Sequence, residues 1–113
     1  MGDEPRLDVL QGTLDLLVLK ALQLGPMHGW GIADLLRRGS DDVLQLGQGS
    51  LYPALYRLER QGFISSSWKT TENNRRARYY VLTASGRARL AREREEWKRM
   101  SQAVDQVLRM SPS

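Results

Sequence analysis

The sequence contains no cysteine and a single histidine, His28, and these two scarcities remove several classes of chemistry. Without cysteine the chain has neither a disulfide framework nor a thiolate nucleophile, which fits a reducing cytoplasm. One histidine without suitable partners is a poor basis for a metal site or a general base. We therefore interpret His28 as a capping or packing residue, and we expect no enzymatic activity, no metal and no cofactor.

Long hydrophobic runs are also absent. No apolar stretch approaches the roughly 20 residues that a membrane span requires, and the polar, acidic start of the chain is unlike a signal peptide. The remaining composition, with 41% hydrophobic and 27% charged residues in 113, is typical of one globular domain. We expect a cytoplasmic protein that does not contact a membrane.

The net charge is only +4, but its distribution is uneven. Residues 69–94 carry eight basic side chains and two acidic ones, whereas the rest of the chain is slightly acidic. A local basic patch on a nearly neutral body indicates an anionic partner that is met on one face. A solvated run of charges is the alternative interpretation.

Hydrophobic periodicity predicts three helices before this basic window, over residues 10–24, 27–39 and 49–62. In the third, Leu51, Ala54, Leu55 and Leu58 form one apolar face. The opposite side carries Pro53, Tyr56, Arg57 and Arg60, and Tyr52 lies on the flank. An ordinary amphipathic helix and a helix that faces a polyanion both fit this pattern.

The third helix contains a proline and ends at a glycine. We place Pro53 within three residues of a cap at Gly49 or Ser50, where a missing backbone N–H costs little. Gly62 can adopt the left-handed conformation that ends helices. The sequence therefore predicts a short, well-bounded helix here.

A β-hairpin follows this helix. Alternating side chains predict strands at Phe63–Thr71 and Arg76–Thr83, and Glu72–Asn74 is turn chemistry because Asn tolerates left-handed conformations. The hairpin tip is basic, with Lys69 on one strand and Arg75, Arg76 and Arg78 on the other. A further short strand is expected at Val43–Leu46.

The last predicted helix starts at a Thr83 cap and runs to about Met110. Its apolar residues follow a heptad seam of Leu90, Trp97, Met100, Val104 and Val107. Such seams pack against a partner helix, so we expect a homodimer. Leu16 and Leu19, which lie off the core stripe of the first helix, are expected to join this interface. The alternative is that the last helix folds back on its own domain.

The order of helix, helix, helix, hairpin and long helix is that of a winged helix-turn-helix. We therefore expect a mainly α protein with a small β-hairpin wing. Residues 1–83 would form the winged helix-turn-helix and residues 84–113 the C-terminal dimerisation helix, together making one compact unit. In this arrangement the third helix enters the DNA major groove and the hairpin lies along the backbone or a neighbouring groove.

The motifs in these elements resemble those of the PadR family of bacterial transcriptional regulators, in its short form with one C-terminal helix. The resemblance covers roughly residues 8–88 and rests on four stretches: residues 28–32 (HGWGI), 49–59 (GSLYPALYRLE), 62–64 (GFI) and 75–83 (RRARYYVLT), with Gly86 after them. Trp30 stands where the family often has tyrosine. The resemblance implies a dimer that binds operator DNA through the third helix and the wing and usually represses.

The candidate DNA-binding residues are Ser50, Tyr52, Pro53, Tyr56, Arg57, Arg60, Lys69, Asn73, Asn74, Arg75, Arg76 and Arg78. We assign Ser50 and Tyr52 to phosphates, and Pro53 to a sugar or a thymine methyl group. Tyr56 and Arg57 are the candidates for base edges, since arginine paired with guanine is the commonest specific contact. The wing cations would bind the backbone or the minor groove.

Two further expectations follow. A dimer predicts an operator that is an inverted repeat with half-sites about one helical turn apart. Trp97, near the centre of the seam, is a candidate contact for a small, flat, hydrophobic effector, although an aromatic at a seam position is more often plain packing. A winged helix can also serve as a protein-docking module without DNA binding, which is the alternative function.

Overall fold

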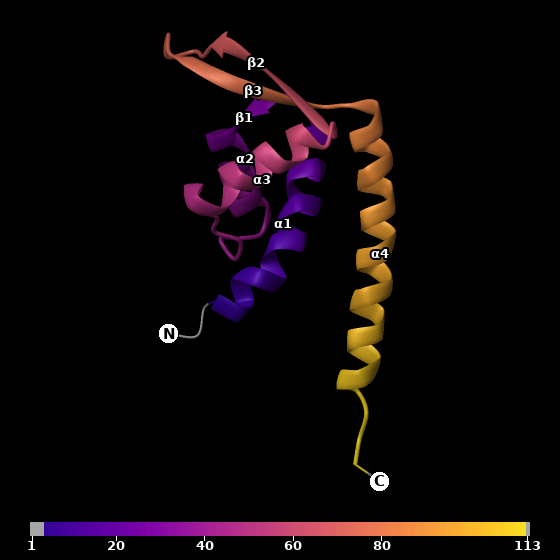
Figure 1. Cartoon of the computed structure of the whole chain (residues 1–113). Coiled ribbons are helices and arrows are strands. Elements are labelled where there is room, and N and C mark those ends of the chain that lie inside the picture. Colours follow the sequence, from indigo (N-terminus) through magenta and orange to yellow (C-terminus); the bar gives the residue numbers. More distant parts are fainter. Residues whose placement is uncertain (1–3, 113) are drawn as a thin grey trace.

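The computed structural model describes the backbone of residues 4–112 and the side chains of residues 12–47 and 49–112. Its elements are α1 (Glu4–Gln23), β1 (Met27–His28), α2 (Gly29–Gly39), α3 (Gln48–Arg60), β2 (Ile64–Thr70), β3 (Arg76–Leu82) and α4 (Ala84–Leu108). Helices α1, α2 and α3 pack together beneath the sheet, and α4 descends beside α1 (Figure 1). The predicted fold, a mainly helical chain with a hairpin wing and a long last helix, is confirmed.

The hydrophobic core lies where the first three helices meet the inner face of the sheet. Its buried members are Leu14, Val18, Leu19, Ala21, Leu22, Ile32, Leu36, Leu51, Ala54, Leu55, Leu58, Ile64, Tyr80, Leu82 and Leu90. All four residues predicted for the apolar face of α3 are among them. Because burying one such side chain contributes about 1.5–3 kcal/mol, this face fixes which side of α3 remains outward.

The sheet is antiparallel, in the order β1-β3-β2. Strands β2 and β3 pair from Ile64 opposite Leu82 to Thr70 opposite Arg76, close to the predicted hairpin. Strand β1 was not predicted, because Met27 and His28 were expected at the start of a helix. A strand of two residues has no periodicity to detect, and it forms only because β3 offers it a free edge.

The loop before α3 differs from the expectation. The strand predicted at Val43–Leu46 does not form, and this segment has no regular structure. Asp41 and Asp42 immediately before it have φ values of 52° and 67°, so the chain turns there rather than extending. Leu46 contacts the core from this loop, whereas Val43 is 78% exposed.

Helix α3 begins earlier than predicted, with Gly47 as its N-cap. The Gly47 carbonyl accepts the N–H groups of Ser50 and Leu51, each at 3.1 Å. Pro53 is therefore the sixth residue of the helix, and the expectation that it lies within three residues of the cap is wrong. At this position proline removes one intrahelical hydrogen bond, to the carbonyl of Gly49 at the exposed start of α3.

The end of α3 follows the prediction. Gly62 has φ 82°, and the N–H of Phe63 reaches back to the carbonyl of Leu58 at 3.0 Å. These are the features of a Schellman motif, in which a left-handed glycine closes the last turn. The chain consequently leaves α3 directly into β2.

Helix α4 starts at the predicted cap. The Thr83 hydroxyl accepts the N–H of Gly86 at 3.0 Å and donates to the carbonyl of Gly62 at 2.7 Å. A Cβ on Gly86 would overlap the carbonyl oxygen of Phe63, so the first turn of α4 needs glycine to lie against the start of β2. Leu90 then packs into the core. The division at residues 83 and 84 into two functional units remains a prediction.

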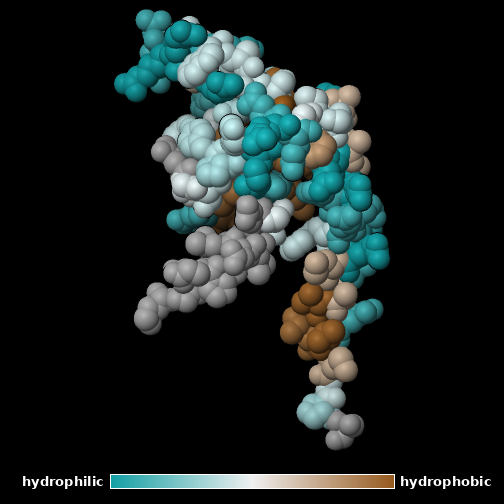
Figure 2. All heavy atoms as spheres, in the orientation of Figure 1, coloured by the Kyte–Doolittle hydropathy of each residue, from teal (hydrophilic) through white to brown (hydrophobic). Residues whose placement is uncertain are grey.

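Two of the seven residues expected at a dimer interface are not available to one. Leu19 is 0% exposed and Leu90 is 3% exposed, because both pack inside their own chain. Assigning them to a subunit contact was therefore wrong. Leu16 is partly buried, whereas Trp97, Met100, Val104 and Val107 are exposed. Hydrophobic residues gather on the lower half of α4 (Figure 2).

Candidate nucleic-acid interface

The outward face of α3 carries the predicted polar and aromatic residues. Ser50, Tyr52, Pro53, Tyr56 and Arg60 are all exposed. The guanidinium of Arg60 lies 5.8 Å from the centre of the Tyr56 ring, one turn earlier on the same face. This stacked pair places a cation and an aromatic ring side by side toward solvent.

Arg57 does not belong to this face. Its Nη2 donates to Oδ1 of Asp15 on α1 at 2.6 Å, and the two side chains are only 33% and 22% exposed. Burial raises the pKa of the Asp15 carboxyl above its usual value, and the positive charge of Arg57 opposes that rise. Arg57 therefore joins α3 to α1, which corrects the expectation that it points toward DNA bases.

The hairpin formed by β2 and β3 projects beyond the core, and we call it the wing (Figure 1). Its turn closes through hydrogen bonds between Thr71 and Arg75, including Thr71 N–H to the Arg75 carbonyl at 2.6 Å. Asn74 has φ 60°, the left-handed conformation predicted for this turn. The exposed side chains toward the tip are Lys69, Asn73, Asn74, Arg75 and Arg76.

Arg78 is held more firmly than the cations at the tip. Its Nε donates to Oγ of Ser66 at 2.8 Å, and its Nη2 lies 3.7 Å from Oε2 of Glu59. Its guanidinium also lies over the ring of Trp68. Arg78 is thus partly engaged at the base of the wing, although its side chain is still 45% exposed.

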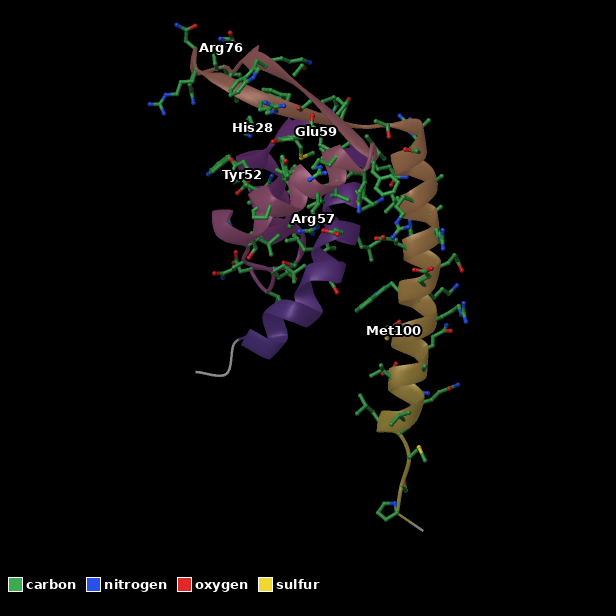
Figure 3. All side chains as sticks on the ribbon, in the orientation of Figure 1. His28, Tyr52, Arg57, Glu59, Arg76 and Met100 are labelled. Atoms are coloured by element: carbon green, nitrogen blue, oxygen red, sulfur yellow. The ribbon has the colours of Figure 1, made fainter. Side chains whose placement is uncertain are left out.

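The wing and the start of α3 line one hollow of about 750 Å³. Its lining comes from β1, α2, α3 and the wing: His28, Gly29, Trp30, Tyr52, Trp68, Thr71, Asn73, Arg75, Arg76, Ala77, Arg78 and Tyr80. In Figure 3, Arg76, His28 and Tyr52 follow one another down the same end of the molecule. Residues that are far apart in the sequence therefore face one side.

The start of α2 forms the floor of this hollow. His28 Nδ1 accepts the N–H of Gly31 at 2.9 Å, so His28 is the N-cap of α2, and its ring meets the edge of Tyr79 at 5.1 Å. The interpretation of His28 as a capping and packing residue is confirmed. A Cβ on Gly29 would lie 2.8 Å from the Tyr52 hydroxyl oxygen, so glycine allows Tyr52 to rest on α2.

Sequence reasoning missed two tryptophans in the hollow, Trp30 and Trp68. Trp30 is 68% exposed at the start of α2, and Trp68 is exposed on β2. Trp68 could have been identified from the sequence, because it lies on a strand of the predicted wing. No periodicity identifies Trp30, because only the packing of α2 under the wing brings it here.

A second hollow, of about 620 Å³, lies between α1 and α4. Its lining is Gly12, Thr13, Leu16, Glu93, Glu96, Trp97, Met100, Ser101, Val104 and Asp105. It contains Trp97, the residue predicted to contact an effector, together with most of the exposed seam. The hollow separates the lower part of α4 from the α1 helix.

A helix with a free polar face and a basic hairpin beside it are the two DNA-contacting parts of a winged helix-turn-helix. The start of α3 and the wing line one hollow here, so the fold and the site define a DNA-binding protein of this class. Among residues 4–112, no helix is both long enough and apolar enough to cross a membrane.

The sequence profile of the transcriptional regulator PadR-like family matches residues 18–92, and the chain belongs to this family. The family consists of transcriptional regulators rather than enzymes, so this protein is a DNA-binding transcriptional regulator. The resemblance read from the sequence motifs is thereby confirmed.

Proteins from several bacteria are similar to this chain in sequence or in structure. A transcriptional regulator of Mycobacterium tuberculosis is 33% identical over 69% of this chain and 69% of its own. The structure of a transcriptional regulator from Clostridium thermocellum superposes with a TM-score of 0.80 at 29% identity, over 88% of this chain and 96% of that one. A PadR family transcriptional regulator from Eggerthella lenta gives 0.79 at 28% identity, over 96% and 93%.

Proposed function

We propose that this protein is a homodimeric repressor that acts in the cytoplasm and binds an inverted-repeat operator through α3 and the wing. The observation that carries the proposal is the shared hollow, in which Tyr52 from α3 and Arg75 and Arg76 from the wing face the same side. One duplex can therefore touch both elements at once. The cations supply affinity through phosphates, and α3 supplies specificity through base edges.

The roles on α3 follow from exposure. Ser50 and Tyr52 lie near the start of the helix, where backbone N–H groups and side-chain hydroxyls suit phosphate oxygens. Tyr56 and Arg60 stand one turn apart on the outward face and are the side chains that reach base edges. Pro53, about one turn before Tyr56 and exposed, packs against a sugar or a thymine methyl group.

Dimerisation is supported by the seam of α4. Trp97, Met100, Val104 and Val107 are all exposed, at heptad spacing and on one helix. Solvent exposure of four such residues is unfavourable, and a second copy of the same helix covers them by symmetry. PadR-family regulators are generally dimeric. The two copies of α3 then read half-sites about 34–36 Å apart, one helical turn of DNA.

The hollow between α1 and α4 supports a response to a small hydrophobic effector. Trp97 offers a flat ring for stacking, and Leu16 and Met100 add apolar surface. A molecule bound there would favour one separation of α1 and α4, and hence one dimer geometry. Quenching of tryptophan fluorescence by flat hydrophobic compounds, lost in Trp97→Phe, tests this role; absence of quenching in the unsubstituted protein contradicts it.

Salt dependence of DNA binding tests the main proposal. Affinity for the DNA upstream of the protein's own gene is measured by fluorescence anisotropy at several salt concentrations. We expect log Kd to rise linearly with log salt, and Arg75→Ala with Arg76→Ala to reduce the slope by roughly 2 and to weaken binding to all sequences alike. A docking module without DNA binding predicts no salt-sensitive complex.

A matched control removes the same charge elsewhere. Arg92 and Arg99 are exposed on α4, outside the hollow formed by α3 and the wing. Replacing both with alanine lowers the net charge as much as the wing pair does, but should leave the salt slope nearly unchanged. Equal losses in the two double variants would show that overall charge, not the wing, governs binding.

A further inference from the structure

Three side chains join the base of the wing to α3. Oγ of Ser66 donates to Oε2 of Glu59 at 2.6 Å, and Nε of Arg78 donates to the same Oγ at 2.8 Å. Nη2 of Arg78 lies 3.7 Å from Oε2 of Glu59 and completes a triangle. The three residues come from α3, β2 and β3, so one small network connects the helix to both strands. Glu59 lies where α3 faces the sheet (Figure 3).

The network continues toward the tip of the wing by stacking. The guanidinium carbon of Arg78 lies 5.8 Å from the centre of the Trp68 ring, and that of Arg76 lies 5.4 Å from the same centre. Trp68 pairs directly with Arg78 in the sheet, and Arg76 is the diagonal neighbour two residues nearer the tip. Glu59, Ser66, Arg78, Trp68 and Arg76 therefore form a continuous series of contacts from α3 outward.

We propose that Glu59 is a positioning residue that sets the angle of the wing relative to α3. The inference rests on the proposed function of the hollow, since it concerns how Arg76 is presented to phosphates while α3 lies in the major groove. On its own a hairpin that projects beyond the core can pivot about its base. The hydrogen bond and ion pair to Glu59 restrict that motion. Trp68 stacks on both Arg78 and Arg76, so the position of Arg76 is restricted as well. Arg78 acts mainly in this network.

This role and simple electrostatics predict opposite signs. Glu59 carries a negative charge close to a surface that meets a polyanion, so its removal should strengthen DNA binding if charge alone matters. If Glu59 positions the wing, its removal should weaken binding despite the gain in net charge. Glu59→Ala and Glu59→Gln change the charge equally. The carboxamide of Gln still offers an oxygen to Ser66, so positioning predicts the smaller loss for Gln.

The first experiment compares these variants in the DNA-binding assay at several salt concentrations. We expect Glu59→Ala to weaken binding about 2- to 30-fold, the range found for residues that act through others. The affinity of Glu59→Gln for DNA should lie between those of Glu59→Ala and the unsubstituted protein. Glu72→Gln is the matched control, because it makes the same charge change at the exposed turn of the wing, and it should bind slightly more tightly. Binding by Glu59→Ala that equals or exceeds that of the unsubstituted protein overturns the proposal.

A double-mutant cycle separates positioning of the wing from other losses. Arg76→Ala should weaken binding in the unsubstituted protein but cost much less in Glu59→Ala, because Arg76 is already displaced there. The salt slope should fall in each single variant and fall little further in the double variant. Additive losses would show that Glu59 does not act through Arg76.

The last measurement needs no DNA. Trp68 is made the sole tryptophan by Trp30→Phe and Trp97→Phe, and its quenching by acrylamide is compared with and without Glu59→Ala. Quenching should increase, less so for Glu59→Gln, while circular dichroism and the thermal midpoint show that the fold is kept. Unchanged quenching overturns the positioning role even if DNA binding is lost. If quenching increases in Glu59→Ala but the unsubstituted protein itself binds no DNA, the proposed function is refuted instead.

Discussion

Replacing Arg57 with alanine should destabilise the fold and leave DNA discrimination intact. The contact at stake joins Arg57 Nη2 and Asp15 Oδ1 at 2.6 Å between α3 and α1. Without Arg57, the Asp15 carboxylate stays largely buried and loses the positive charge that opposes the rise in its pKa. The substitution therefore removes the positive partner of a carboxylate whose ionisation is already disfavoured by burial.

The magnitude follows from the burial of the pair. Breaking a fully buried ion pair costs about 3–5 kcal/mol, and leaving a buried polar group without its partner costs about 1–3 kcal/mol. The Arg57 and Asp15 side chains are 33% and 22% exposed, so water can partly replace the lost contact. The cost of breaking it should therefore lie in the lower of the two ranges. We expect Arg57→Ala to lower the free energy of unfolding by about 1–3 kcal/mol.

Urea unfolding at fixed protein concentration measures this loss, and fixed concentration matters because a dimer's stability depends on it. Asp15→Asn removes the charge that Arg57 balances. In that background Arg57→Ala should cost less, and the shortfall is the coupling free energy of the pair. Costs that simply add would show that the 2.6 Å contact contributes nothing to stability.

Arg60 is the matched control on the same helix. It is exposed and stacks on Tyr56, so Arg60→Ala should change the free energy of unfolding by less than about 0.5 kcal/mol. It should instead reduce the ratio of affinities for operator and scrambled DNA. If Arg57→Ala lowers that ratio and leaves stability unchanged, the assignment of Arg57 to the α1–α3 contact is refuted.

Three further predictions concern other parts of the chain. Gly86→Ala should destabilise by about 1–3 kcal/mol because its Cβ would overlap the Phe63 carbonyl, whereas Gly39→Ala, with open space around it, should not; thermal melts compare them. The raised pKa of Asp15 means that the folded state binds its proton more tightly than the unfolded state does. The unsubstituted protein should therefore lose stability relative to Asp15→Asn as pH rises above 3.8, and parallel melts across that range would show no divergence if the pKa were ordinary. Val104→Glu should convert the proposed dimer to monomer in light scattering, and an unchanged mass would exclude the α4 seam as the interface.

Local patterns predicted those features that depend on neighbours in the sequence. The apolar face of α3, the caps at His28 and Thr83, and the left-handed turn at Asn74 were all readable. Each depends on contacts within a few residues, where periodicity and capping chemistry are informative. The start of α3 was misplaced because the Gly47 carbonyl, not a side chain, receives the first helical hydrogen bonds.

Patterns failed where several elements compete for one side chain. Leu19 and Leu90 fit a subunit interface by spacing, but the core of the same chain encloses them. Arg57 lies on the polar half of α3 by angle alone, yet its partner is 42 residues away. Spacing along a helix fixes the direction in which a side chain leaves the axis, whereas only neighbouring elements determine what it meets.

The sequence by itself determined the class of this protein: the succession of helices and hairpin, the basic wing and the motifs of a PadR-like regulator. Tertiary structure decided which side chains of these elements contact one another. It turned Arg57 inward to Asp15, brought Trp30 and Trp68 into the hollow, and joined Glu59 to Arg78 across three elements. The physical reason is that periodicity records which residues avoid water, while hydrogen bonds and ion pairs between distant segments exist only after the core has set their distances.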